Sequence, residues 1–353
     1  MDQISLTIDG KRVKARDGQT IMETALENGI DIPHLCYHPK LTKTGACRLC
    51  MVRVNGKLLK ASCVEAVADG MNVMTEDKEI AAGRKWVLEL LLLDGDHNCL
   101  YCDADGDCEL QTYVKRYGVE QPSPIDSFHE EREVDYVSSN ALKRNENRCI
   151  LCGRCVRTCR EIQVTNVWGF AERGSRTHLI ADDDKRIGES SCVKCGACIQ
   201  MCPTGALAFQ TVLGKGPAWE QTKESSVCIY CGVGCRIDFY KNKGGLLVRA
   251  LGNDDGPNRG HLCIKGRFGF DFVQSEKRLT TPLIKENGTF KKASWDKALD
   301  LIASKLGEAR DTYGPDSVAA LSSAKCTNEE NYLMQKLMRA VIKTNNVDHC
   351  ARL

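Results

Sequence analysis

The chain has no excess of charge of either sign and no long run of apolar residues. It has 49 lysines and arginines and 47 aspartates and glutamates, and the resulting net charge of +2 does not indicate binding of a polyanion such as nucleic acid. The longest apolar stretch, Trp86 to Leu93, is interrupted by Glu89 and is too short to cross a bilayer. The first ten residues, MDQISLTIDG, lack the basic and apolar segments of a signal peptide. We therefore expect a cytoplasmic protein with no nucleic-acid partner and no transmembrane segment.

The chain also lacks the glycine-rich signatures of nucleotide sites and the H-E-x-x-H motif of metalloproteases. What it has instead is cysteine, 21 residues in 353. Cytoplasmic reductants keep thiols reduced, so a framework of disulfides is not expected. Scattered structural thiols would have irregular spacing, whereas these fall into four regular groups. The spacing therefore predicts metal ligands.

The first group lies in residues 1–78, which alternate like a small sheet. Asp9-Gly10 and Asn55-Gly56 are hairpin turn signals, and residues 20–28 have a helical pattern that ends at Gly29. The cysteines are spaced C-x10-C-x2-C-x12-C, and this segment resembles the β-grasp [2Fe-2S] ferredoxin domain of complex I and iron hydrogenase subunits. Structural zinc is the alternative, but zinc usually takes two close cysteine pairs. The predicted ligands are Cys36, Cys47, Cys50 and Cys63.

The second group lies in residues 79–118, after a helical pattern over residues 76–93. It resembles a [4Fe-4S] segment of the same families, with one histidine and three cysteine ligands spaced H-x3-C-x2-C-x5-C. Here Gly95 stands where that histidine would fall, and the nearest imidazole is His97. His97 is the candidate fourth ligand, with Asp94 or Asp96 as alternatives. The three cysteines are Cys99, Cys102 and Cys108.

The third group lies in residues 146–212, beyond a linker predicted over residues 119–145. The run C-x2-C-x2-C-x3-C occurs twice here, which is typical of bacterial ferredoxins with two [4Fe-4S] clusters. In these ferredoxins the fourth cysteine of each run ligates the other cluster. The resemblance assigns one cluster to Cys149, Cys152, Cys155 and Cys202, and the other to Cys192, Cys195, Cys198 and Cys159.

The fourth group, spaced C-x2-C-x3-C-x27-C, lies in residues 221–277. It resembles the [4Fe-4S] domain that opens the molybdenum or tungsten bis-pterin oxidoreductases. In that family a lysine two residues after the last cysteine sits between the cluster and a pterin, and Lys265 has this position. The alternative is an ordinary solvated lysine. The cysteines are Cys228, Cys231, Cys235 and Cys263.

The groups together predict one [2Fe-2S] and four [4Fe-4S] clusters in an α+β multidomain iron-sulfur protein, with Cys326 and Cys350 left over. A row of clusters without a nucleotide signature is expected to conduct electrons. Residues 278–353 have a different pattern, with a helix capped by Ser294, a strand near Val318, a capping box from Thr327 to Glu330 and a further strand. This order predicts the first βαβ unit of the α/β fold of the bis-pterin oxidoreductases.

The whole arrangement, ending in VDHCARL, resembles the N-terminal part of the catalytic α subunit of metal-dependent formate dehydrogenase. The resemblance implies oxidation of formate to CO2 at a Mo or W bis-pterin guanine dinucleotide, with electrons leaving through the clusters to flavin/NAD or ferredoxin-linked subunits. In that family selenocysteine or cysteine follows a segment like CARL. We therefore expect that the chain stops at a UGA codon for selenocysteine, and that the 353 residues alone are inactive. The alternatives are a complex I large iron-sulfur subunit without catalysis of its own and an iron hydrogenase.

Overall fold

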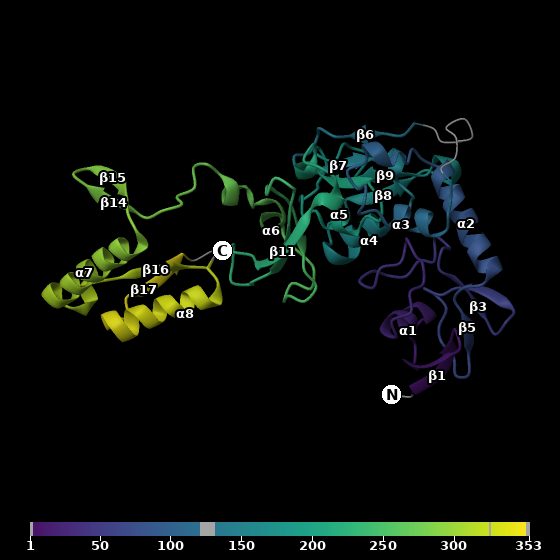
Figure 1. Cartoon of the computed structure of the whole chain (residues 1–353), viewed down its shortest axis with the longest axis horizontal. Coiled ribbons are helices and arrows are strands. Elements are labelled where there is room, and N and C mark those ends of the chain that lie inside the picture. The colour runs from purple at the N-terminus through teal and green to yellow at the C-terminus, as the bar shows by residue number, and fades with distance from the viewer. Residues whose placement is uncertain (1–2, 121–130, 325, 351–353) are drawn as a thin grey trace. The chain divides into compact units, whose positions relative to one another are not determined.

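The computed structural model describes residues 3–120, 131–324 and 326–350, without the side chains of Leu58 and Cys350 (Figure 1). The chain divides into two compact units, Met1–Gln221 and Thr222–Leu353. Together they form the expected α+β multidomain architecture. Pro122 and Pro124 of the predicted linker, and the last three residues of VDHCARL, lie outside the described residues.

The first domain is a five-stranded sheet with the strand order β2-β1-β5-β3-β4. The two turn signals form as expected, with Asp9 and Asn55 at φ of 49° and 50°, each followed by a glycine in the left-handed region. A capping box between Thr20 and Glu23 begins the helix. The core lies between the helix and the sheet and contains Leu6, Ile8, Val52 and Val73. The elements are β1 Gln3–Ile8, β2 Lys11–Arg16, α1 Ile21–Glu27, β3 Met51–Val54, β4 Leu58–Ala61 and β5 Asn72–Met74.

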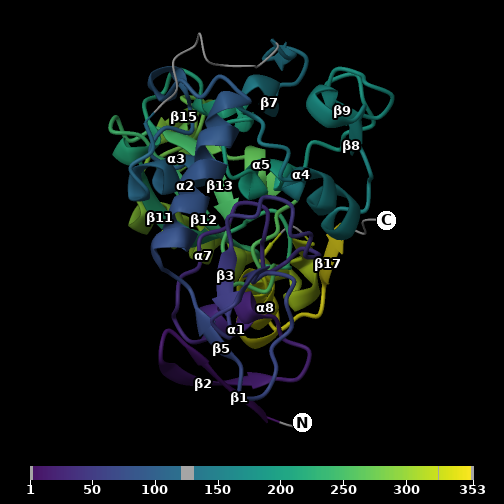
Figure 2. The same ribbon diagram turned by 90° about the vertical axis from the view of Figure 1, so that its right-hand side faces the viewer.

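Two helices, α2 (Lys78–Leu93) and α3 (Glu109–Arg116), follow this sheet. Asp77 caps α2 by accepting a hydrogen bond from the backbone N–H of Ile80 at 2.7 Å. The two helices lie against each other (Figure 2). Leu49, which precedes β3, Leu88 of α2 and Leu110 of α3 share one buried cluster. The residues between them, with a 3-10 turn at Cys99–Tyr101, carry the second cysteine group.

The next domain contains two small sheets and two very short helices. Within the predicted linker, residues 134–135 and 142–145 form β6 and β7, and β7 is buried as the middle strand between β6 and β10. Each short helix begins at a glycine in the left-handed region, Gly153 at φ 69° and Gly196 at φ 71°. The elements are β6 Val134–Asp135, β7 Leu142–Asn145, α4 Arg154–Arg157 with a π-helical continuation Thr158–Ile162, β8 Trp168–Ala171, β9 His178–Ala181, α5 Ala197–Met201 and β10 Leu207–Phe209.

The second unit begins with a three-stranded antiparallel sheet and the helix α6, which share a core with Ile237, Ala250 and Leu262. A hairpin and a long helix follow, and then β16 and β17 pair in parallel across the crossover helix α8, as the predicted βαβ unit requires. Both α7 and α8 leave their apolar faces exposed in the part of the chain that the structure describes. The elements are β11 Thr222–Val227, β12 Arg236–Lys241, β13 Leu247–Gly252, α6 Ile264–Phe268, β14 Leu283–Glu286, β15 Thr289–Lys292, α7 Trp295–Tyr313, β16 Ala320–Ser323, α8 Asn328–Lys336 and β17 Val347–Cys350.

Ser294 and the Thr327–Glu330 capping box begin α7 and α8 as predicted. The predicted strand near Val318 begins two residues later, at Ala320, because a 3-10 turn at Pro315–Ser317 precedes it. Among the described residues, no helix has both the length and the apolar composition needed to cross a membrane.

Candidate metal centres

The four cysteines of the first group converge beside the sheet of the first domain. The backbone N–H of Cys36 lies 3.4 Å from the Sγ of Cys47, and the reverse pair has the same distance. The Sγ atoms of Cys50 and Cys63 are 3.4 Å apart. Three of the four residues are at most 1% exposed. The thiols therefore face one another in a space that is shielded from solvent.

Their close approach shifts the pKa of each thiol. Hydrogen bonds from Cys47 and Cys63 lower the pKa of Cys36, and a hydrogen bond from Cys63 lowers the pKa of Cys50 to about 7. Cys47 and Cys63 show the opposite shift. The hydrogen bond with Cys36 raises the pKa of Cys47, and the hydrogen bonds with Cys36 and Cys50 raise the pKa of Cys63. Protons are thus shared within the group, and binding of iron would displace them.

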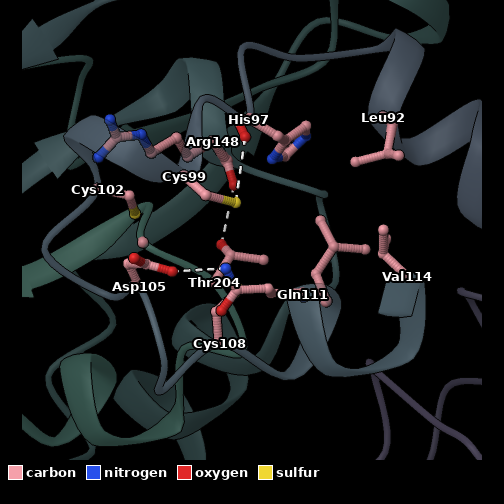
Figure 3. Close-up of a pocket in the computed structure, with 12 residues that line it drawn as sticks. Leu92, His97, Cys99, Cys102, Asp105, Cys108, Gln111, Val114, Arg148 and Thr204 are labelled. Atoms are coloured by element: carbon pink, nitrogen blue, oxygen red, sulfur yellow. Dashed lines mark hydrogen bonds between the residues drawn. The ribbon is translucent and has the colours of Figure 1, made fainter. Parts of the chain in front are cut away.

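The second group lines a single cavity (Figure 3). Its members come from the turn after α2, the 3-10 turn and the residue that caps α3, where Cys108 Sγ accepts a hydrogen bond from the backbone N–H of Gln111 at 3.5 Å. Apolar side chains such as Leu92 and Val114 form part of the wall, and burial raises the pKa of Cys108 to about 12. The four candidate ligands that line the cavity are His97, Cys99, Cys102 and Cys108.

The geometry favours His97 over the two aspartates as the fourth donor. Asp94 accepts a hydrogen bond from Arg132 at 2.9 Å, Asp96 accepts one from the backbone N–H of Asn98 at 3.2 Å, and neither lines the cavity. The Nε2 of His97 lies 3.0 Å from the carbonyl oxygen of Leu91, the kind of bond by which a ligating histidine fixes its tautomer and leaves Nδ1 for metal. A Cβ on Gly95 would lie 2.7 Å from the same Nε2, so the ring of His97 lies beside the position at which the spacing H-x3-C would place a histidine.

Gly205 provides a test of this cavity. A Cβ at Gly205 would lie 2.4 Å from the Sγ of Cys102, which cannot move away while it ligates iron. We expect Gly205→Ala to remove the cluster of this cavity, a loss of ~4 iron atoms per chain. The matched control is Gly83→Ala in α2, where a Cβ would meet nothing within 4 Å. Iron analysis of both variants checks the prediction, and full iron content in Gly205→Ala would contradict it.

In the third group, the fourth cysteine of each run lies near cysteines of the other run. One cavity is lined by Cys149, Cys152 and Cys155 of the first run together with Cys202 of the second. Cys159 instead lies close enough to Cys192 and Cys198 to raise the pKa of both thiols, after the larger effect of burial. Burial also raises the pKa of Cys149 and of Cys152 to about 12. The fold thus exchanges the fourth cysteine of each run.

Backbone N–H groups point at these sulfurs. Leu151 N lies 3.4 Å from Cys149 Sγ, Lys194 N 3.4 Å from Cys192 Sγ, and Val167 N 3.3 Å from Cys159 Sγ. Such donors stabilise the negative charge on a thiolate and help to set the potential of a cluster.

The fourth group is more open. Cys228 is buried and its backbone N–H donates to the carbonyl of Cys235 at 2.8 Å, whereas Cys231 and Cys263 are exposed. Burial, and then the nearby thiols of Cys263 and Cys231, raise the pKa of Cys228. The pKa of Cys235 is likewise raised by burial and then by the other three thiols, which indicates that all four sulfurs lie near one another. Lys265 lies in α6, two residues after Cys263, with its side chain exposed. In the described part of the chain, that side chain makes no hydrogen bond or ion pair.

No set of three or more His, Cys, Asp or Glu donors among the described residues is arranged around a single ion. Three cysteines of the second group and four of the third each line a cavity of their own, which suits the binding of a multinuclear cluster. Cys326 joins none of the groups, and the side chain of Cys350 lies outside the description.

Sequence reasoning missed the buried arginines around these groups. Arg84 is 2% exposed and donates to the carbonyl oxygens of Leu49, Met51 and Thr75 at 2.9 to 3.1 Å, and it pairs with Glu76. The other fully or nearly buried arginines include Arg144, Arg154, Arg157 and Arg267. An arginine is expected at the surface, so no local signal in the sequence marks these positions.

Family models match almost the whole chain. They are described as 2Fe-2S iron-sulfur cluster binding domain (residues 1–78), NADH-ubiquinone oxidoreductase-G iron-sulfur binding region (84–123), NADH-quinone oxidoreductase subunit 3 ferredoxin-like domain (139–208), molybdopterin oxidoreductase Fe4S4 domain (221–275) and molybdopterin oxidoreductase (278–353).

Individual proteins agree with these models. The chain is 35% identical to "Putative formate dehydrogenase YrhE" of Bacillus subtilis and 35% identical to an NADH-quinone oxidoreductase subunit of Rhizobium meliloti, over 99% of its own length and 40% of theirs. It thus spans about two fifths of the curated relatives that it matches. Among solved structures, a chain of an NAD+-reducing [NiFe]-hydrogenase is 34% identical with a TM-score of 0.56, covering 61% of this chain and 90% of that one.

Proposed function

Because the chain comprises the electron-transferring iron-sulfur region and the beginning of the molybdopterin domain of a molybdopterin oxidoreductase, we propose that it is the N-terminal part of a formate dehydrogenase α subunit. The electrons of formate, released as CO2 forms, would leave through this chain toward a partner that reduces NAD or ferredoxin. The observation that carries the proposal is the order of the cysteine groups, from the [2Fe-2S] domain to the Fe4S4 domain of the oxidoreductases. A relative named for formate dehydrogenase supports the substrate.

We propose the following ligand sets for five clusters. The 19 cysteines of the four groups and His97 hold them, in the sets predicted from the sequence, with Cys202 and Cys159 exchanged between the two ferredoxin runs. Each cluster, when bound, accepts and returns one electron. The chain's own contribution is to hold the thiolates, exclude water and direct N–H groups at the sulfurs.

Lys265 has a separate role in the proposal. Its position two residues after Cys263 and its exposed ammonium suit a contact between the fourth cluster and a Mo or W bis-pterin guanine dinucleotide bound by the full-length protein. A positive charge there would stabilise an added electron. No other residue of this chain is assigned to the reaction of formate.

A second candidate function is electron transfer alone, as in the large iron-sulfur subunit of complex I. It is favoured by the equal resemblance to the relative from Rhizobium meliloti. The two functions differ in which compound can reduce the clusters.

Anaerobic reduction of the full-length protein separates them. On addition of formate, we expect the visible absorption of the oxidised clusters to bleach without any partner protein, and Lys265→Met to slow the bleaching without loss of iron. Bleaching by NADH through a partner subunit, with no response to formate, would favour the second function and overturn the first.

A further inference from the structure

Two buried arginines project from the same short helix into the space between the ligand loops of different domains. Arg154 and Arg157 are 2% and 4% exposed. They lie at the two ends of α4, on either side of the proposed ligand Cys155. Both lie near the thiol of Cys152, and they differ in whether a carboxylate pairs with the guanidinium.

Arg154 is neutralised by a carboxylate. Its Nη1 and Nη2 donate to the two carboxylate oxygens of Glu109 at 2.6 and 2.9 Å, and Nη2 also donates to the carbonyl oxygen of Tyr37 at 2.7 Å. This bidentate ion pair is complete without any cluster.

Arg157 donates only to backbone carbonyl oxygens. It reaches Thr42 O at 2.5 Å and Gly153 O at 3.2 Å, and a single atom, Nη2, donates both to Cys36 O at 2.7 Å and to Cys152 O at 3.1 Å. Within the residues that the structure describes, no carboxylate lies within ion-pair distance of it. A buried cation is unfavourable unless negative charge lies nearby, so the surroundings of Arg157 favour an anion close to it.

The anions are identified by the residues that Arg157 bridges. Cys36 belongs to the proposed [2Fe-2S] ligand set, and Cys152 belongs to the proposed [4Fe-4S] set with Cys149, Cys155 and Cys202. A cluster held by four thiolates is negatively charged, and its reduction adds a further negative charge that a nearby cation stabilises.

We propose that Arg157 is the shared counter-charge of these two clusters and raises the reduction potential of both. It is also a positioning residue, because its Nη2 donates to the backbone carbonyls of a proposed ligand of each cluster, Cys36 and Cys152. These two ligands are 116 positions apart in the chain. The inference rests on the proposed ligand sets, but not on the identity of the substrate.

The test is a redox titration of the cluster-loaded chain with dithionite, followed by paramagnetic resonance. Arg157→Gln keeps an N–H donor and removes the charge. We expect both clusters to become about tenfold harder to reduce, a fall of ~59 mV for a one-electron couple, with iron content unchanged. Arg157→Lys should restore the potentials. The cluster of Cys192, Cys195, Cys198 and Cys159 should change less.

The matched control is the double variant Arg154→Gln with Glu109→Gln, which removes a neutral pair from the same helix. It should leave the potentials unchanged. An equal fall in the double variant, or unchanged potentials in Arg157→Gln with full iron content, would overturn the proposal. If Arg157→Gln loses iron, Arg157→Lys distinguishes the two explanations. Iron retained in Arg157→Lys with native potentials would support the role of the positive charge. Iron lost from Arg157→Lys as well would show that the guanidinium has only a packing role, and would overturn the proposal.

Failure of this inference is distinguishable from failure of the proposed function. Dithionite fills the clusters whether or not the full-length protein oxidises formate. If the chain bound no iron, that result would contradict the proposed function itself, and also the ligand sets on which this inference rests.

Discussion

Replacing Cys202 by alanine removes the [4Fe-4S] cluster of Cys149, Cys152 and Cys155, and spares the cluster of the run to which Cys202 itself belongs. The reason is the crossed geometry, in which Cys202 lines the cavity of the first run. The methyl group of alanine cannot ligate iron as a thiolate does. Burial raises the pKa of Cys149 and Cys152, so these thiols do not readily ionise to bind iron without the fourth ligand. We expect a loss of ~4 iron atoms per chain and of one resonance signal.

The mirror variant and a neutral cysteine complete this experiment. Cys159→Ala should remove the other signal, that of the second run, since Cys159 lies near Cys192 and Cys198. Cys326→Ala should keep all iron, because the sequence spacing assigns Cys326 to no ligand set. If Cys202→Ala and Cys159→Ala each removed the cluster of their own run, the crossed ligand sets would be wrong.

Removal of the clusters by a chelator and oxidant should unfold the ligand segments of the ferredoxin-like domain while the β1–β2 hairpin persists. The helix α5 contains five residues, and α4 with its π-helical continuation contains nine, both below the length at which a helix is stable by itself. We expect amide protection there to fall about 100-fold, or ~2.8 kcal/mol. Hydrogen exchange resolved along the chain measures this.

The first domain and α7 serve as internal references. The sheet of the first domain has its own buried core, with Ile8, Val52 and Val73 each at 0% exposure, and α7 lies in the second unit with 19 residues. Protection in these elements should change much less. Unchanged protection in α4 and α5 after complete loss of iron would contradict the view that the clusters form part of the core of their domain.

Local chemistry made several elements predictable from the sequence. Asp9-Gly10 and Asn55-Gly56 need φ above zero and so specify their hairpins, and the Thr327–Glu330 capping box begins α8 where the pattern predicts it. Cysteine spacing predicts the ligand loops because a cluster needs its thiolates at fixed offsets along a tight turn, and this assignment stays a prediction. These signals lie within a few residues of the structure that they determine.

The rest depends on partners that are distant in the chain. Arg157 donates to a carbonyl 121 residues away, and β7 forms the middle strand of a sheet in which β10, more than 60 residues later in the chain, is one of its two neighbours. The sequence makes His97 the candidate and leaves Asp94 and Asp96 as alternatives, and only the fold shows that His97 lines the cavity and the two aspartates do not. Contacts of this kind leave no periodicity and no motif, which is why sequence patterns assigned residues 134–145 to a linker.

The central claim is that these cysteines hold iron as five clusters. Purification without oxygen, followed by iron, sulfide and zinc analysis with paramagnetic resonance of the reduced protein, tests it most directly. The account predicts a brown protein with ~18 iron atoms per chain and signals of one [2Fe-2S] and several [4Fe-4S] clusters. A colourless protein, or one that contains zinc in place of iron and sulfide, would contradict it.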